Sequence, residues 1–350
     1  MKNKYYSLKK IKSLDAEYNI LLGMRSNGKS YAVKEEVLKN AYLREENFVY
    51  LRRWQEDIKR AAVLSYFADA PIEKITGGEF DGVDVYGGEI YFANYEEDGK
   101  KVRGQKIGRA CALNEAERYK SQNFGNTTGI ILEEFVTDSM YLTNEPSRLQ
   151  QFVSTVFRNK KGKVWLVGNT ITRVCPYFME WGLKNALKQK SGTIDLYHFD
   201  TKDGRVNIAL ERCEVLDNRE GAMFFGSAAG QIISGEWETE EVPHLKKKLE
   251  EYDLIYEIEV SSQNLRFCMQ LLVEPEEGGR LVYVYPLTKD RFILRKISDI
   301  YDDSPFVSTG FQERRKPEKI MHELIKSGKV CFSDNLTGAD FKSVLQFLDI

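Results

Sequence analysis

The chain has 350 residues, of which 42% are hydrophobic and 12% aromatic, so it can form a sizeable core and is neither disordered nor fibrous. Its formal net charge of −2 excludes a general polycation, and any contact with nucleic acid must come from local basic patches. The five cysteines are scattered without a CxxC pair, which argues against a disulfide framework and against a zinc site. Because the sequence has neither a secretory signal nor a run of ~20 apolar residues, we expect a soluble, intracellular protein.

Short apolar segments alternate with helical patterns over the first 200 residues. We predict strands at 17–23, 47–54, 129–135, 163–169 and 193–199. We predict helices at 29–46 and 55–70. The glycine-rich stretch 75–101 is expected to form hairpins that decorate the core. Alternation of this kind predicts an α/β fold with a central, mostly parallel sheet covered by helices on both faces.

The pattern changes after about residue 200. Residues 220–237 are rich in Gly, Ala and Ser without clear periodicity, which favours a linker or a lid. Three apolar segments follow at 254–260, 265–274 and 280–287, and their close succession predicts an antiparallel meander. Two helical stretches near 314–327 and 338–348 end the chain. We therefore expect one domain over 1–200, a linker over 201–240 and a smaller α+β domain over 241–350.

The segment GMRSNGKS, residues 23–30, matches the phosphate-loop pattern G-x-x-x-x-G-K-[ST] between a predicted strand and a predicted helix. Its glycines let main-chain N–H groups approach phosphates, and the helix N-terminus adds its dipole. Lys29 would neutralise the β- and γ-phosphates of ATP, and Ser30 would ligate Mg²⁺. The residues expected to contact the nucleotide are Gly23, Met24, Arg25, Ser26, Asn27, Gly28, Lys29 and Ser30.

Polar residues follow two later strands at the positions that a phosphate loop requires. The strand GIILEEF ends in Glu133 and Glu134. Glu133 would help to hold the metal, and Glu134 would act as the general base on the attacking water. The usual first residue of such a pair is Asp, so Glu133 is a departure. Asn169, which ends KVWLVGN, is either a sensor of the γ-phosphate or a simple turn residue.

Two basic clusters are candidates for contact with a phosphate backbone. Residues 99–109 carry Lys100, Lys101, Arg103, Lys106 and Arg109 without an acidic residue. Residues 157–163 carry Arg158, Lys160, Lys161 and Lys163. Such clusters can bind nucleic acid without reading its sequence, and a merely solvated face is an equal alternative.

The order and spacing of five segments resemble one protein family. These segments are GMRSNGKSYAVK, FVYLRRW, ERYKSQNFGNTTGIILEEF, TVFRNKKGKVWLVGN and CPYF. Together they are similar to the DNA-packaging motor ATPases of the small tailed phages that replicate by protein priming. The similarity covers residues 15–185 and, beyond the linker, rests on the strand pattern. It implies a terminase-like, additional-strand P-loop ATPase of the catalytic-glutamate type, in a pentameric ring at the portal of a viral prohead in the host cytoplasm, which translocates double-stranded DNA.

The resemblance also implies roles for single residues. Arg158 matches an arginine finger supplied to the neighbouring subunit, and Lys120 matches a second basic residue that acts across the subunit interface. Arg52 matches an arginine that senses the state of the nucleotide. The C-terminal domain is expected to resemble an RNase H-like nuclease that has lost its active site, and some relatives also dock on a structural RNA. Glu257 and Glu259 share a strand face, which leaves a residual two-metal nuclease open, although exposed strand carboxylates are favoured.

Two other functions fit parts of the sequence. A P-loop kinase or other small-molecule phosphotransferase would use the phosphate loop but not the general base Glu134. A nucleotide-gated assembly or docking protein would bind DNA or prohead with only incidental hydrolysis. The leading expectation is an ATP-driven DNA translocase.

Overall fold

The computed structural model of the chain describes residues 5–96, 100–158, 160–201, 204–214, 237, 241–276, 278–300 and 302–350. Of the predicted linker over 201–240, residues 202–203, 215–236 and 238–240 lie outside the described residues, whereas Gly204–Arg212 form a strand of the first compact unit rather than a linker. The chain divides into two compact units. Unit 1 comprises Met1–Thr137, Tyr141–Thr170 and Pro176–Glu236, and unit 2 comprises Asp138–Met140, Ile171–Cys175 and Trp237–Ile350.

The second unit includes two short segments from the first 200 residues, Asp138–Met140 and Ile171–Cys175, which the sequence pattern did not predict. In Ile171–Cys175, the side chain of Val174 is fully buried in the core of unit 2. The hydroxyl of Thr172 also donates a hydrogen bond of 3.0 Å to the hydroxyl of Ser343. Apolar burial and this hydrogen bond assign the segment to unit 2, so the units do not coincide with consecutive stretches of sequence.

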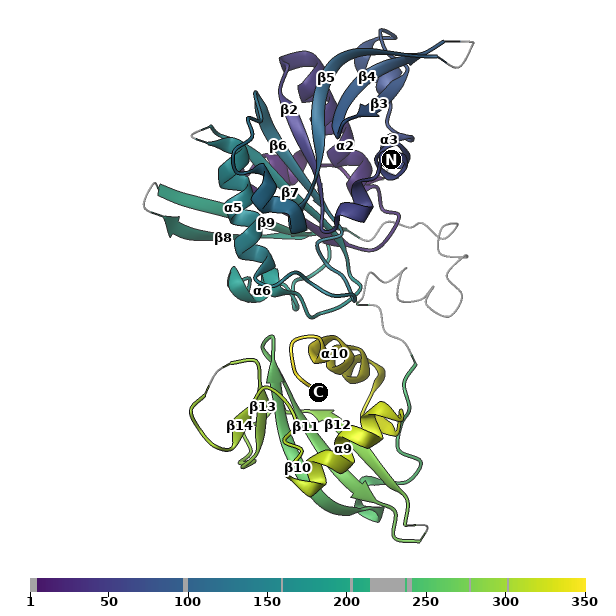
Figure 1. Cartoon of the computed structure of the whole chain (residues 1–350), viewed down its shortest axis with the longest axis vertical. Helices are drawn as coiled ribbons and strands as arrows, with labels where there is room; N and C mark the ends of the chain where they lie inside the picture. The colour runs from purple at the N-terminus through teal and green to yellow at the C-terminus, as the bar shows by residue number, and fades with distance from the viewer. Residues whose placement is uncertain are drawn as a thin grey trace. The chain divides into compact units, whose positions relative to one another are not determined.

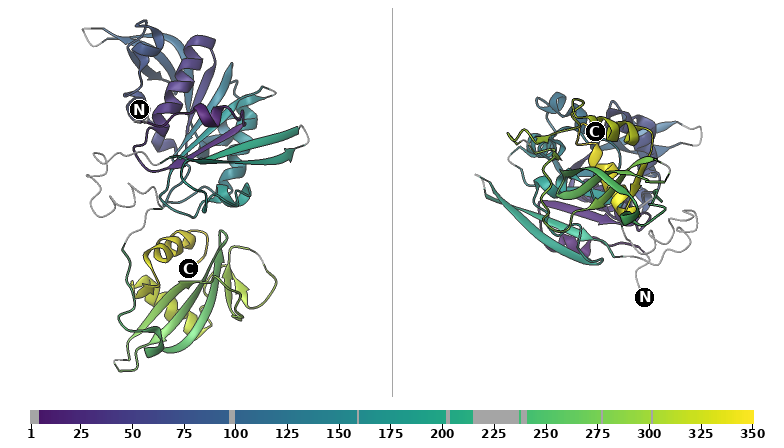
Figure 2. Two further views of the ribbon diagram at one scale, coloured as in Figure 1. Left: turned by 180° about the vertical axis from the view of Figure 1, so that it is seen from behind. Right: turned by 90° about the horizontal axis from the view of Figure 1, so that it is seen from below.

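Unit 1 is built on a nine-stranded sheet with the order β3-β4-β5-β2-β6-β7-β1-β9-β8. Its strands are β1 Tyr18–Gly23, β2 Asn47–Arg52, β3 Gly82–Tyr86, β4 Glu89–Tyr95, β5 Lys101–Ala112, β6 Thr127–Glu133, β7 Lys163–Asn169, β8 Thr193–Thr201 and β9 Gly204–Arg212. Six strands that are adjacent in the sheet, β5, β2, β6, β7, β1 and β9, pair in parallel with one another. Antiparallel hairpins close both edges, and the β8–β9 hairpin is clear from behind in Figure 2. This confirms the predicted mostly parallel sheet.

The central strands are apolar on both faces because helices cover both faces. Leu21, Phe48 and Ile131 share one core with the helix α2 Lys29–Arg44. Their neighbours in sequence, such as Ile20 and Ile130, are fully buried on the opposite face, where the helix α5 Glu145–Phe157 packs against β6. The two helices can be followed in Figure 1.

The remaining helices in the described residues of unit 1 are short. They are α1 Lys9–Lys12, η1 Gln55–Ile58, α3 Arg60–Phe67, α4 Ile72–Thr76, η2 Leu113–Tyr119 and α6 Pro176–Glu180. The helix predicted at 55–70 is wrong as one element, because the backbone at Lys59 is extended with ψ 146° and separates η1 from α3. No helix in the described ranges is both long and apolar enough to cross a bilayer.

The stretch 75–101 extends the central sheet rather than decorating it. The β3–β4 hairpin pairs with β5, and β5 pairs in parallel with β2 (Figure 1). Val83, Phe92 and Ile107 from these strands are buried in the same core as α2. Gly87 and Gly88, with φ 58° and 81°, form the turn between β3 and β4.

Unit 2 has a six-stranded sheet with the order β14-β13-β10-β11-β12-β15. Its elements are η4 Leu249–Glu251, β10 Asp253–Ser262, β11 Leu265–Val273, β12 Arg280–Pro286, β13 Lys296–Ser298, β14 Val307–Ser308, α9 Lys316–Lys326, β15 Val330–Phe332 and α10 Asn335–Leu345. The predicted meander is confirmed as the antiparallel strands β10 to β12. Next to β10, the short strands β13 and β14 run in parallel. Both α9 and α10 contribute to the apolar core.

Candidate active site

The carboxyl ends of β1, β6 and β7 meet at one edge of the unit 1 sheet. Strand β7 lies between β6 and β1, so it is the additional strand between the acidic pair and the phosphate loop. Leu22 and Gly23 of β1 pair with Gly168 and Asn169 of β7. In parallel sheets, ligands bind at this carboxyl edge. The edge therefore brings together residues that the sequence placed more than 100 positions apart.

The phosphate loop, residues 23–30, joins β1 to α2 through two left-handed residues. Ser26 has φ 59° and Gly28 has φ 90°, and the absent side chain of Gly28 makes that conformation accessible. Asn27 is buried, and its side-chain oxygen accepts a hydrogen bond of 3.2 Å from the main-chain N–H of Lys29. Its side-chain nitrogen is buried without a hydrogen-bond partner among the described residues. A buried amide donor inside such a loop fits a phosphate oxygen.

Lys29 is buried and bonds to the loop itself. Its ammonium donates to the carbonyls of Gly23 at 3.2 Å and Met24 at 2.6 Å, and to the side-chain oxygens of Asn27 at 3.2 Å and Asn169 at 3.1 Å. Burial lowers the pKa of Lys29 to about 8. The contact with Asn169 places the predicted sensor next to the predicted phosphate-binding lysine.

Glu133 lies at the end of β6 with a separate partner for each carboxylate oxygen. The Ser30 hydroxyl donates to Oε2 at 3.2 Å, and the Tyr66 hydroxyl donates to Oε1 at 2.7 Å. Burial raises the pKa of Glu133, while the two hydrogen bonds favour its charged form. A hydroxyl and a carboxylate at hydrogen-bond distance are the hard oxygen ligands that Mg²⁺ prefers. Ser30 and Glu133 therefore fit the predicted magnesium site.

Glu134 follows Glu133 but has a different environment. It lies beyond the strand with φ 57°, and its side chain is 59% exposed. The Arg52 guanidinium donates to its Oε2 at 2.6 Å. The predicted general base and the predicted sensing arginine are thus in direct contact.

A buried ion pair beneath the acidic residues was missed by sequence reasoning. Arg53 donates to Glu145 through Nε at 2.7 Å and Nη2 at 3.0 Å, and both side chains are buried. Arg53 also donates to the main-chain carbonyls of Glu134 at 3.1 Å and Phe135 at 3.0 Å. The Tyr177 hydroxyl donates to Glu145 at 3.0 Å. The one feature of the sequence that could have pointed to this ion pair is that Arg53 directly follows Arg52.

A cavity of about 610 Å³ opens over the phosphate loop. It is lined by Tyr5, Ser26, Asn27, Gly28, Lys29, Ser30, Tyr31, Lys34, Asp69 and Asn169. Tyr5 approaches Gly28, because a Cβ at Gly28 would lie 3.4 Å from the Cβ of Tyr5. Tyr31 and Lys34 follow the phosphate loop on α2, whereas Tyr5 and Asp69 lie outside the motif and only folding brings them to this cavity.

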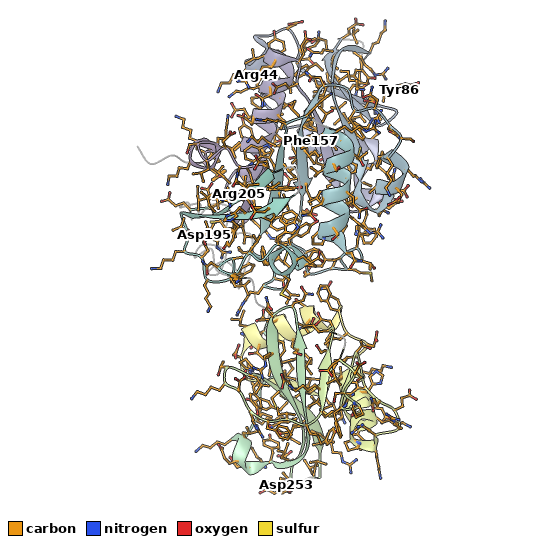
Figure 3. All side chains as sticks on the ribbon, turned by 90° about the vertical axis from the view of Figure 1, so that its left-hand side faces the viewer. Arg44, Tyr86, Phe157, Asp195, Arg205 and Asp253 are labelled. Atoms are coloured by element: carbon orange, nitrogen blue, oxygen red, sulfur yellow. The ribbon has the colours of Figure 1, made fainter. Side chains whose placement is uncertain are left out.

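Arg158 and Lys120 lie near the amino ends of the central strands, whereas the phosphate loop lies at their carboxyl ends. Arg158 caps the C-terminus of α5 directly after Phe157, which Figure 3 labels. It donates to the main-chain carbonyl of Lys120 at 2.7 Å. Nearby, Lys160 bonds to the carbonyl of Gly125, just before β6 begins. Because β6 and β7 begin here and end beside the phosphate loop, Arg158 lies about the length of a strand away from the phosphate loop of its own chain.

Most of the basic segment 99–109 lies on the strand β5. Lys101 and Arg103 on β5 pair with Asp84 of β3, at 3.9 Å and 2.6 Å. Lys106 pairs with Glu89 of β4 at 2.7 Å, and Arg109 also contacts Glu89. The segment carries no acidic residue itself, but folding supplies carboxylates from the adjacent hairpin.

In unit 2, Glu257 is half-buried and Glu259 is buried, so the expectation of exposed strand carboxylates is wrong for Glu259, and both residues face basic side chains. Arg291 donates to both carboxylate oxygens of Glu257, at 2.9 Å and 2.7 Å. Arg266 donates to Glu259 at 3.0 Å, and Lys296 lies 3.4 Å from its other oxygen. No group of three or more His, Cys, Asp or Glu side chains suited to a metal ion is present in the part of the chain that the structure describes.

Known proteins with similar sequences and folds package viral DNA. The DNA packaging proteins of Bacillus phages PZA and phi29 are each 27% identical over 236 residues, which cover 66% of this chain and 65% of theirs. The DNA packaging protein of Bacillus phage B103 is 30% identical over 179 residues, which cover 49% of this chain and 50% of that protein. The matches thus span less than two thirds of these relatives.

A solved structure supports the fold. A chain of the bacteriophage Phi-29 viral genome packaging motor assembly superposes with a TM-score of 0.52 at 20% identity, covering 95% of this chain and 96% of that one. Unit 1 accordingly shares the mostly parallel α/β architecture of that chain. The family model of the podovirus DNA encapsidation protein (Gp16) matches residues 1–337. This chain therefore belongs to the podovirus DNA encapsidation protein (Gp16) family.

Proposed function

We propose that this chain is the ATP-hydrolysing subunit of a motor that moves double-stranded viral DNA through the portal into a preformed prohead. Family membership supports the packaging role. One geometric observation carries the motor mechanism. The phosphate loop and Glu134 lie at the carboxyl ends of the central strands, and Arg158 lies at their amino ends. Such a chain completes its site only when a second copy supplies the arginine.

Each residue at the carboxyl edge has a defined part in hydrolysis. Lys29, now bonded to loop carbonyls and Asn169, would turn toward the phosphates of ATP. Ser30 and Glu133 would hold Mg²⁺, which offsets phosphate charge when bound. Glu134 would accept a proton from the attacking water once its ion pair with Arg52 opens.

The proposed assembly is a homopentameric ring. Arg158 would approach the γ-phosphate of the neighbouring subunit, with Lys120 beside it, because the two residues are in contact at the amino edge. Hydrolysis would then pass from subunit to subunit. The proposed partners are the portal of the prohead, DNA and, as a further candidate, a structural packaging RNA, and the proposed place of action is the host cytoplasm.

DNA contact by the start of β5 is a further part of this proposal. Lys100, Lys101, Arg103 and Lys106 lie along this region, and Asp84 and Glu89 partly neutralise the last three. We therefore expect these residues to contribute modestly to DNA binding. Replacing one residue that contacts a DNA phosphate lowers the steepness of the plot of log binding constant against log salt concentration by about one. A slope that is unchanged in Lys100→Ala and Lys101→Ala would exclude these two residues.

Unit 2 would serve as an RNase H-like docking domain, and we do not expect nuclease activity from it. The order of its sheet, with an antiparallel meander followed by the parallel strands β13 and β14, supports this assignment. Arg291 occupies both oxygens of Glu257, Arg266 occupies Oε1 of Glu259, and the ammonium of Lys296 lies 3.4 Å from Oε2, so cations stand where a metal pair would bind. Supercoiled DNA that is incubated with the protein and Mn²⁺ should stay intact. Metal-dependent nicking that the Glu257→Gln substitution abolishes would overturn the expectation that unit 2 lacks nuclease activity.

Mixing of two inactive variants tests the shared site. Glu134→Gln removes the general base from one subunit, and Arg158→Ala removes the arginine supplied to the next. Ring subunits of the two kinds should recover part of the DNA-stimulated ATPase rate, because some interfaces then combine an intact Glu134 with an intact Arg158. If no ratio restores activity, although each variant binds ATP and assembles, the site is not shared.

The same variants separate the alternatives. A small-molecule kinase should keep phosphoryl transfer in Glu134→Gln, whereas the proposed motor should lose turnover and keep ATP binding. A docking protein with incidental hydrolysis should bind DNA or prohead equally in Lys29→Ala and show negligible turnover in the wild type.

A further inference from the structure

Tyr66 contacts the buried carboxylate that the phosphate loop needs for its metal. Its hydroxyl donates to Glu133 Oε1 at 2.7 Å, while Ser30 donates to Oε2 at 3.2 Å. Glu133 is only 6% exposed, so bulk water cannot replace either partner. The tyrosine occupies one carboxylate oxygen and leaves the other directed at Ser30.

The Tyr66 side chain is itself held on two sides. Its ring stacks on Tyr50 of β2 with centroids 4.4 Å apart. The buried Lys34 donates to the main-chain carbonyl of Tyr66 at 2.7 Å and lies 4.6 Å over its ring. Lys34 lies one helical turn after Ser30 on α2. Helix α2, which begins at the phosphate loop, therefore holds Tyr66 in place through Lys34, and Tyr66 in turn holds the carboxylate of Glu133.

We propose that Tyr66 is a positioning residue for the magnesium-organising carboxylate of Glu133. The inference rests on the proposed ATPase function. Glu is longer than Asp by one methylene, about 1.5 Å, and this extra length lets the carboxylate reach the hydroxyl on α3 while it contacts Ser30. A longer side chain has more rotamers, and the hydroxyl selects one of them. Tyr66 thus explains how this chain uses Glu where Asp is usual.

The first experiment measures metal-dependent nucleotide binding without turnover. In the Glu134→Gln background, a fluorescent ATP analogue is titrated at increasing Mg²⁺. Tyr66→Phe should raise the Mg²⁺ concentration for half-maximal binding about tenfold, because a hydrogen bond to a charged group is lost. Binding of the analogue without Mg²⁺ should change less than about twofold. Electron paramagnetic resonance of bound Mn²⁺ gives a second readout.

Tyr42→Phe is the matched control. The Tyr42 hydroxyl donates to Glu79 at 2.8 Å and to the Thr76 carbonyl at 3.0 Å, remote from the phosphate loop. The control therefore loses a hydroxyl–carboxylate bond of the same kind from α2 and should keep the wild-type Mg²⁺ dependence. A shift as large as that of Tyr66→Phe would mean that loss of stability, not positioning, causes the effect.

A double-mutant cycle tests the role of side-chain length. In Glu133→Asp, the shortened carboxylate no longer reaches Tyr66, so adding Tyr66→Phe should change the Mg²⁺ dependence less than about twofold. Equal shifts with and without the Glu133→Asp substitution, or no shift in either case, would overturn the proposal. A failure of the proposed ATPase function would give a different result, because the Lys29→Ala variant would then bind the ATP analogue as tightly as the wild type does.

Discussion

Arg52, the last residue of β2, and Glu134, the residue directly after β6, form an ion pair of 2.6 Å. The next residue, Arg53, binds the main-chain carbonyl of Glu134 at 3.1 Å. Two consecutive arginines therefore hold the side chain and the main chain of one glutamate. We propose that this ion pair occupies the carboxylate that the attacking water would need, so that it holds Glu134 in a resting state.

Arg52→Gln should release Glu134. We expect ATP hydrolysis without DNA to rise several-fold, while stimulation by DNA falls, because the carboxylate is then available in every nucleotide state. Arg205→Gln is a suitable control, since Arg205 pairs with Asp200 at 3.1 Å on the distant β8–β9 hairpin. An unchanged or lower basal rate in Arg52→Gln would show that the ion pair does not restrain the base.

Glu134→Gln should separate binding from turnover. The amide cannot accept the proton of the attacking water, so the ATPase rate should fall by about 10²–10⁴-fold. The dissociation constant of ATP should stay near the wild-type value, because Glu134 lies outside the phosphate loop and its side chain is largely exposed. Single-turnover hydrolysis and equilibrium binding measure the two quantities, and a parallel loss of both would contradict the assigned role.

Nucleotide affinity should weaken as the pH rises above about 8. Burial lowers the pKa of Lys29 to about 8, so the free protein loses the ammonium above that pH, whereas bound phosphates favour the protonated form. The dissociation constant of ATP should increase by up to about tenfold per pH unit between pH 8 and 9. In Lys29→Met this dependence should disappear, and a wild-type affinity that is flat from pH 7 to 9 would contradict the assignment.

The same shift has a consequence for folding. Between pH 8 and 10.5 the unfolded chain keeps the Lys29 proton that the folded chain has lost. The unfolded state therefore binds more protons, and this residue's contribution to the free energy of unfolding rises with pH in that window. Comparison of urea unfolding of the wild type and Lys29→Met across this range isolates the contribution.

The Arg53–Glu145 pair should be important for stability. Glu145→Ala leaves a buried guanidinium without its carboxylate, which should lower the free energy of unfolding by about 3–5 kcal/mol. The double variant Arg53→Met, Glu145→Leu should lose less, since it removes both charges. Denaturant unfolding provides the measurement, and a double variant as unstable as the sum of the single variants would show that the two residues act independently.

The sequence by itself determined the parts of the site that are local. The phosphate loop depends on neighbouring residues, because Gly28 supplies a left-handed residue and Lys29 and Ser30 follow at the helix start. The acidic residues at 133 and 134 and Asn169 could be assigned because parallel strands end at a common edge. Apolar runs likewise predicted the central strands, since burial on both faces removes the polar alternation.

Only the tertiary structure decided which distant side chains meet. The ion pair of Arg52 with Glu134 and the hydrogen bond of Tyr66 with Glu133 join positions 82 and 67 residues apart, and neither leaves a periodic pattern. The basic residues of 99–109 looked uncompensated until β3 and β4 brought Asp84 and Glu89 beside them. Hydrophobic periodicity reports whether a residue is buried, but partner choice between charged groups depends on sheet order and register, which are set by packing of the whole chain.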